Sequence, residues 1–289
     1  MIISKPSVKN LWHKDDKMGL FSKLNEMPKI PILMYHEIST VLERNKKIRS
    51  TNPIYTLSIK QFDEQMKYIH ENDYQTLSLD EFMNPRLRTN EKKVIITFDD
   101  GWANNYSNAF PILKKRNLTA TIFVITGFVG RDEYMDWRQL RQMGEEGMSI
   151  QSHTVSHRPL TVLENHEIMY ELQGSKKSIE EHLGKRVDFL SVPHGMIDRR
   201  VIGTAQIVGY KAICTSEPGF SHSYGNPAIL KRINISDHCE ASTFEQIIQT
   251  NRMVILFPIL SKKIKNLIRK SLGNKNYKKL YRLRFRIGV

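Results

Sequence analysis

The sequence has few cysteines and no long apolar run. Only Cys214 and Cys239 carry thiols among 289 residues, and Cys214 lies in the apolar stretch KAICTS. Two cysteines are too few for a small domain built on disulfides, and we expect both thiols to be reduced and structural. No segment approaches the ~18–20 apolar residues of a membrane-spanning helix. The N-terminal segment breaks its apolar run at Lys5 and lacks the apolar core of a signal peptide, so we expect a cytoplasmic location.

Acidic residues are missing from the last part of the chain. Lys and Arg number 44 against 30 Asp and Glu, so the formal net charge is +14. No acidic residue follows Glu245, whereas twelve cations do, which leaves only +2 for residues 1–245. A nearly neutral body without a recognisable nucleic-acid motif argues against a nucleic-acid partner.

The basic end of the chain has an amphipathic pattern. Within 261–272 the apolar residues Ile264, Leu267, Ile268 and Leu272 recur at helical spacing between cations, and a short apolar run precedes them at 253–260. The pattern predicts a basic amphipathic helix. Residues 253–289 would then lie on an anionic membrane surface, at the inner face of the membrane. The alternative is a solvated helix packed on the body of the protein.

The body alternates between strand and helix patterns. Seven apolar, β-branched runs predict strands at 29–35, 94–98, 120–126, 148–152, 187–192, 211–216 and 229–235. Helices are expected at about 58–71, 105–116, 136–146, 164–183 and 198–208, with Asp136 as the N-cap of the third. Strands separated by helices form a parallel sheet. The expected fold is a distorted (β/α)7 barrel over 29–250, with an N-terminal arm at 1–28 and a basic tail at 251–289.

Polar residues that follow the predicted strands are the candidate site, because barrel enzymes build their sites at the carboxyl ends of strands. Asp99 and Asp100 end one strand, and His153 and His157 follow another. Two imidazoles and one carboxylate make a three-ligand set with room for water, which is typical of a catalytic zinc site. The alternatives remain open: Asp-Asp-Gly is common turn chemistry, and a lone histidine is usually structural.

Three motifs together carry a family resemblance. Thr97-Phe98-Asp99-Asp100-Gly101, Ser-His-Thr-x-x-His at 152–157 and Pro-x-Gly at 193–195 resemble the polysaccharide deacetylases of the NodB-homology type, carbohydrate esterase family 4, over roughly 29–236. The stretch Leu33–Ile38 is similar to the branch that deacetylates poly-β-1,6-N-acetylglucosamine, in which the acid histidine comes from the N-terminal strand.

The resemblance implies a role for each matching residue. Asp99 would be the general base and His36 the general acid, although a structural histidine at a strand end is the alternative for His36. Asp100, His153 and His157 would bind a divalent metal, with Zn²⁺ expected first and Ni²⁺ or Co²⁺ as alternatives. A backbone amide in the third motif would hold the oxyanion; Pro193, His194 and Gly195 occupy that place.

The third motif departs from the family pattern. Leu190 and Ser191 stand where many members have an arginine that orients the base, and His194 replaces an aromatic residue. Arg232, from a neighbouring strand, could supply the guanidinium, unless it is an exposed surface charge. Trp102 is a candidate for stacking on sugar, with plain packing as the alternative, and Trp137 is expected to pack.

The resemblance predicts a metal-dependent hydrolase that removes N-acetyl groups from N-acetylhexosamine units. The saccharide substrate would be a polysaccharide or, given the basic tail, a lipid-linked precursor. Two alternatives follow from the altered third motif and from the chemistry of the site. One is a barrel that binds saccharide or membrane without turnover, and the other is a deacylase acting on an O-acetyl or formyl group.

Overall fold

The computed structural model describes residues 30–40, 55–84, 92–221, 228–251 and 253–254. The N-terminal arm predicted at 1–28 lies outside these residues, as does the amphipathic helix predicted at 261–272. None of the described helices is long and apolar enough to cross a bilayer.

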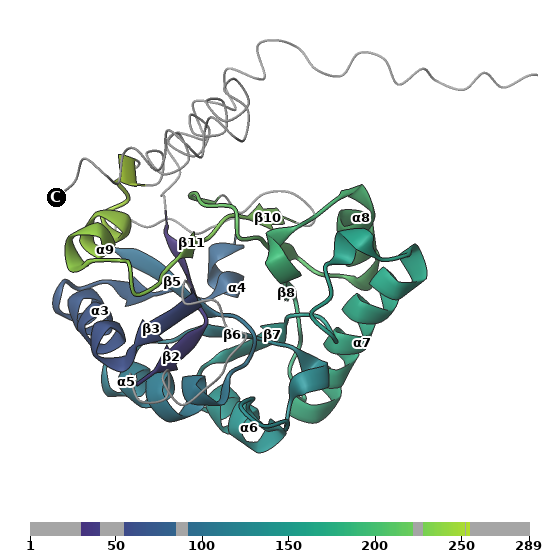
Figure 1. Cartoon of the computed structure of the whole chain (residues 1–289), viewed down its shortest axis with the longest axis horizontal. Helices are drawn as coiled ribbons and strands as arrows, with labels where there is room; N and C mark the ends of the chain where they lie inside the picture. Colours follow the sequence, from purple (N-terminus) through teal and green to yellow (C-terminus); the bar gives the residue numbers. More distant parts are fainter. Residues whose placement is uncertain (1–29, 41–54, 85–91, 222–227, 252, 255–289) are drawn as a thin grey trace, which may run out of the picture.

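A curled, entirely parallel sheet forms the centre of the molecule (Figure 1). Its main path runs β10-β9-β8-β7-β6-β5-β1-β11. The strands are β1 (Ile32–Tyr35), β5 (Lys93–Phe98), β6 (Thr121–Val124), β7 (Ser149–Ser152), β8 (Phe189–Ser191), β9 (Ala212–Cys214), β10 (Ala228–Leu230) and β11 (Ile233–Asn234). The short β4 (Gln75–Thr76) pairs with the start of β5, and β2 (Glu37–Ser39) pairs with β3 (Thr56–Ser58) in a second small sheet.

One chain segment joins the two edges of the main sheet. β10 pairs with β9. Only two residues separate β10 from β11, which pairs with β1 at the other end of the path. The single strand predicted at 229–235 is therefore split at Lys231 and Arg232. Counted as one, this segment is the seventh strand of an imperfectly closed barrel, which confirms the predicted (β/α)7 architecture.

The helices pack around the outside of the sheet (Figure 1). They are α3 (Ile59–Glu71), α5 (Phe110–Lys115) after a π-helical turn at Asn105–Ala109, α6 (Trp137–Glu145), α7 (Asn165–Leu183), α8 (Arg199–Val208) and α9 (Ala241–Ile248). Asp136 caps α6 by accepting from the Gln139 amide, as predicted, and Ser58 caps α3 by accepting from the Gln61 amide.

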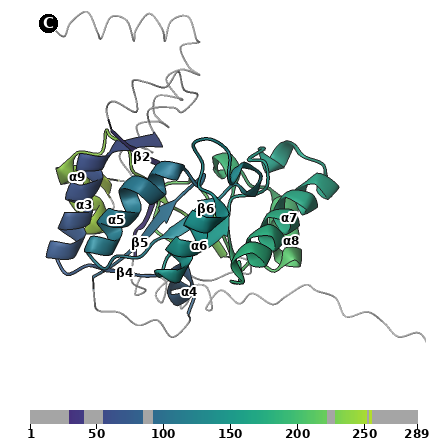
Figure 2. The same ribbon diagram turned by 90° about the horizontal axis from the view of Figure 1, so that it is seen from below.

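Apolar side chains fill the barrel at the end where the strands begin. Ile32, Ile95, Phe123 and Phe189 project inward from β1, β5, β6 and β8, and Leu79 and Phe82 of α4 (Leu79–Phe82) pack against them. Figure 2 shows α4 at the opposite end of the barrel from β2. A second apolar layer lies between the outer face of the sheet and the helices.

Candidate active site

Side chains from four parts of the sequence meet at the carboxyl ends of the strands. They surround a cavity of about 280 Å³. The predicted residues that line it are His36, Asp99, Asp100, Trp102, His153, His157 and His194. Tyr55, Phe128, Tyr134 and Ser216 also line it and were not predicted. Of the other predicted residues, Arg232 lies behind Asp99, away from the cavity.

Asp100, His153 and His157 present their ligand atoms to one point. Asp100 Oδ1 lies 3.4 Å from His153 Nε2 and 3.5 Å from His157 Nε2. A tetrahedral ion with metal–ligand bonds of about 2.0–2.1 Å separates its ligand atoms by about 3.3–3.5 Å. Both separations match this value, all three ligand atoms lie within 4.8 Å of one another, and the three side chains form the one such cluster among the described residues.

Neighbouring groups hold two of these ligands in the required orientation. His153 Nδ1 lies 2.8 Å from the Ser191 carbonyl oxygen, to which it donates, so Nε2 is the ring atom that faces Asp100. Trp102 Nε1 donates to Asp100 Oδ2 at 3.0 Å, which leaves Oδ1 turned to the histidines. Hydrogen bonds of this kind, made by residues that do not bind the metal themselves, orient metal ligands and change the affinity for the metal.

The charges around the metal ligands shift their pKa values in different directions. Burial raises the pKa of Asp100, but the hydrogen bond from His153 and the positive charge of the histidines outweigh it and hold this pKa at about 2. Burial, together with the neighbouring His153, lowers the pKa of His157 to about 4. Asp100 is thus ionised and His157 neutral at pH 7, which are the forms that bind a cation.

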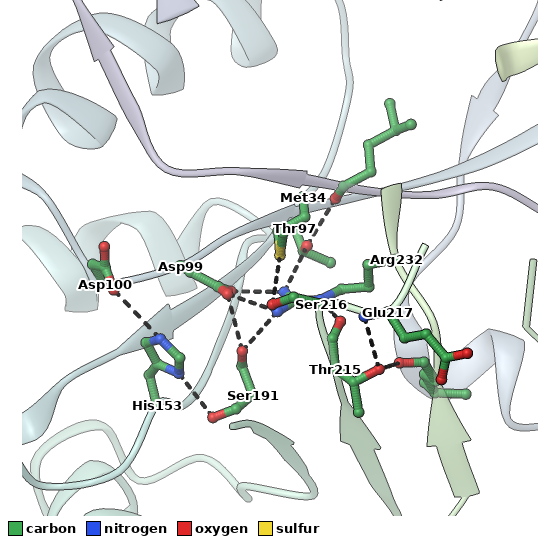
Figure 3. A network of polar contacts seen from close by, with 12 residues as sticks. Met34, Thr97, Asp99, Asp100, His153, Ser191, Thr215, Ser216, Glu217 and Arg232 are labelled. Atoms are coloured by element: carbon green, nitrogen blue, oxygen red, sulfur yellow. Dashed lines mark hydrogen bonds and ion pairs between the residues drawn. The ribbon is translucent and has the colours of Figure 1, made fainter. Parts of the chain in front are cut away.

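Asp99 forms a buried, two-pronged ion pair with Arg232 (Figure 3). The guanidinium donates at 2.7 Å to Oδ1 and at 2.6 Å to Oδ2, and Arg232 is 0% exposed. Arg232 also donates to Ser191 Oγ and to the Thr215 carbonyl, while Ser191 Oγ donates to Asp99 Oδ2. Burial raises the pKa of Asp99, but the Arg232 charge outweighs this and holds the pKa well below its usual range.

His36 reaches the cavity from the end of β1. Its ring packs against Tyr55 with centroids 4.4 Å apart, and its Nδ1 atom is buried with no hydrogen-bond partner within the described part of the chain. Burial outweighs the charges of Asp100 and Asp99 and lowers the pKa of His36 below its usual range. The protonated form of this ring is therefore favoured only by the negative charges of Asp100 and Asp99.

The third motif forms a tight turn after β8. His194 has a positive φ of 58°, and its ring centroid lies 5.1 Å from that of His157. Pro193 has no N–H, and the Gly195 N–H donates to the Val192 carbonyl at 3.0 Å. Of the three residues expected to hold the oxyanion, His194 is therefore the one whose backbone N–H is left to donate to a bound oxygen.

Trp102 and Trp137 have different surroundings. Trp102 is only 7% exposed, and one face is covered by Tyr134 at a centroid distance of 4.7 Å. Its indole N–H donates to Asp100, so its contact in the structure is with one of the three candidate metal ligands. Trp137 packs against His182, with ring centroids 4.0 Å apart.

Several residues of this site were not predicted as site residues from the sequence. Ser191 links Asp99 to His153, Glu171 on α7 binds the loop between His153 and His157, and Tyr55 and Tyr134 form walls of the cavity. Ser191 was noted only as a departure from the family motif. The others lie far from the motifs in sequence, and nothing in their local pattern marks them.

Residues 86–213 match the family model described as polysaccharide deacetylase. YxkH of Bacillus subtilis (strain 168), assigned as a polysaccharide deacetylase, is 32% identical over 240 residues, which cover 82% of this chain and 82% of that protein. The poly-β-1,6-N-acetyl-D-glucosamine N-deacetylase of Staphylococcus aureus (strain MRSA252) is 27% identical over 211 residues, covering 68% of this chain and 71% of that one.

Solved structures share the same fold. The Streptococcus pyogenes deacetylase PplD, in complex with acetate, superposes with a TM-score of 0.69 at 29% identity, covering 76% of this chain and 98% of that one. IcaB from Ammonifex degensii has a TM-score of 0.65 at 21% identity and covers 77% of this chain and 97% of that one, a likeness of fold.

The Asp99–Arg232 pair leads to a prediction about stability. Arg232→Met leaves a buried carboxylate unpaired, so the free energy of unfolding should fall by about 3–5 kcal/mol in urea titrations. Arg116→Met removes an ion pair to the half-exposed Asp63 and should cost about 1 kcal/mol or less. Adding Asp99→Asn to Arg232→Met should recover part of the loss; equal losses in the two arginine variants would contradict the argument.

The Trp102–Asp100 contact leads to a prediction about metal affinity. Trp102→Phe keeps an aromatic ring on Tyr134 but removes the N–H donor, and zinc affinity should fall about tenfold in competition with a chelating dye. Tyr106→Phe removes an exposed hydrogen bond to Gln142 and serves as the control, with affinity unchanged. Wild-type affinity in Trp102→Phe would show that the indole does not tune Asp100.

Proposed function

Because the chain belongs to the polysaccharide deacetylase family, we propose that its cavity hydrolyses the acetamide of N-acetylhexosamine units to an amine and acetate. The observation that carries the proposal is the Asp100, His153 and His157 cluster beside the separate carboxylate of Asp99 in one cavity. Saccharide is the substrate class of the family.

Asp100, His153 and His157 would hold the divalent ion. We propose zinc, because two imidazoles and one carboxylate suit this borderline ion and leave a coordination position open; nickel and cobalt accept the same ligands. When bound, the ion supplies Lewis acidity to a water molecule and to the acetamide carbonyl.

The remaining residues divide the proton transfers between them. Asp99 is ionised at neutral pH and takes the proton from the attacking water, while Arg232 and Ser191 keep its carboxylate in place. The His194 amide donates to the oxygen that gains negative charge. His36 gives a proton to the departing nitrogen, which leaves as an amine. Burial lowers the pKa of His36, so the ring gives up its proton readily, while the charges of Asp100 and Asp99 act in the opposite direction.

The proposed roles of Asp99 and His153 have distinct consequences. Asp99→Asn should abolish acetate release from N-acetylglucosamine oligomers while the metal content persists, because it removes a base and no ligand. His153→Ala should lose both the metal and the activity. Metal analysis and an acetate assay with added zinc measure the two effects, and Asp63→Asn, at the surface, is the control. Full activity in Asp99→Asn would refute the assigned base.

We further propose that the basic tail places the enzyme at an anionic membrane surface on the cytoplasmic side. The support is the concentration of twelve cations after Glu245, with apolar residues at helical spacing among them. The substrate would then be a lipid-linked or nascent saccharide.

Vesicle flotation tests the membrane proposal. The full chain should float with vesicles that contain phosphatidylglycerol and not with pure phosphatidylcholine. Lys262→Glu, Lys263→Glu and Lys265→Glu combined should abolish flotation by reversing the charge of the predicted helix. A full chain that stays in the soluble fraction with both kinds of vesicle would overturn the proposal.

A further inference from the structure

The loop that carries His157 has an unfavourable backbone conformation. Thr154 has a φ of 67° and His157 a φ of 61°. Positive φ is uncommon for residues other than glycine, and it is least favourable for a β-branched residue such as Thr154. Such residues are destabilising and persist only where the surroundings impose the conformation. Contacts outside the loop must therefore hold it.

Glu171 of α7 supplies the largest group of such contacts. One carboxylate oxygen accepts from the Val155 N–H at 2.8 Å and from the Ser156 N–H at 2.9 Å, and the other accepts from the Ser156 hydroxyl. Glu171 is only 3% exposed. Hydrogen bonds to an ionised acceptor are roughly twice as strong as neutral ones. A buried carboxylate thus binds the middle of the loop between the two histidines.

The opposite side of the same loop contacts the turn after β6. The Val155 carbonyl accepts from the Gly127 N–H at 2.9 Å, and the Thr154 carbonyl accepts from the Thr126 N–H at 3.1 Å. The backbones are so close that a Cβ on Gly127 would lie 2.6 Å from the Val155 oxygen. The loop is held between this turn and α7, and Glu171 is the one charged side chain that binds residues 155–156 in the described structure.

We propose that Glu171 is a positioning residue for the metal site. It belongs neither to the ligand cluster nor to the residues that line the cavity; it fixes residues 155–156 and thereby sets His157 Nε2 opposite Asp100 Oδ1 and His153. The inference rests on the metal site proposed above. Hydrogen bonds to Glu171 of α7 stabilise the loop conformation that places His157 beside His153.

The test compares two carboxylates of α7 that both accept from backbone N–H groups. Glu171→Ala should lower zinc affinity about tenfold, measured with a chelating dye, because His157 is no longer held in place. It should also speed amide hydrogen exchange at residues 154–157. Glu180→Ala removes the acceptor for the Val187 N–H, away from the site, and should leave both measurements unchanged.

A conservative variant separates positioning from loss of folding. Glu171→Gln keeps an oxygen for the two N–H groups and an amide that can donate to the Ser156 hydroxyl, so its zinc affinity should stay within about threefold of wild type. Should Glu171→Ala not fold, Ser156→Ala, which removes one of the three bonds, should show a smaller loss in the same direction.

The outcomes distinguish the two proposals. Wild-type zinc affinity and loop exchange in Glu171→Ala would overturn the positioning role. A wild-type protein that binds zinc but releases no acetate from any N-acetyl sugar would overturn the proposed reaction, while the affinity loss in Glu171→Ala would still support the positioning role. A wild-type protein that binds no zinc, nickel or cobalt would overturn both.

Discussion

The buried ion pair between Asp99 and Arg232 is the interaction around which the site is organised. Neither charge is stable in the barrel interior alone, because transfer of an unpaired ion out of water costs several kcal/mol. Together they join the end of β5 to the segment between β10 and β11. The guanidinium also donates to the Thr215 carbonyl just after β9. The pair therefore lies where the two edges of the sheet meet, and it spans the imperfect closure of the barrel.

Ser191 connects this pair to the metal ligands. Its hydroxyl donates to Asp99, and its carbonyl accepts from His153 Nδ1. The proposed base and the proposed metal site are consequently fixed to one residue of β8. Because apolar side chains fill the other end of the barrel, these polar groups have water on one side only. The arrangement explains how a carboxylate can stay ionised and oriented within a largely apolar interior.

Much of this architecture could be predicted from local patterns. The apolar run before Asp99 predicted β5, and Asp136 predicted the start of α6, since strand and cap signals depend on neighbouring residues. The three motifs indicated Asp99, Asp100, His153 and His157, and the structure brings these four side chains into one cavity. The sequence left two interpretations of Arg232, a residue that orients Asp99 or an exposed surface charge. Its complete burial against Asp99 could not be predicted from its neighbours in sequence.

The amino-acid sequence by itself determined the order of strands and helices, the residues at the ends of the strands, and the separation of a nearly neutral body from a basic end. These features depend on periodicity and composition within short windows. Only the tertiary structure decided that one strand divides between both edges of the sheet, that Trp102 turns its N–H to Asp100, and that Glu171 holds the loop of His157. Those contacts form only when the barrel closes and packs, and local sequence patterns do not determine which distant side chains then meet.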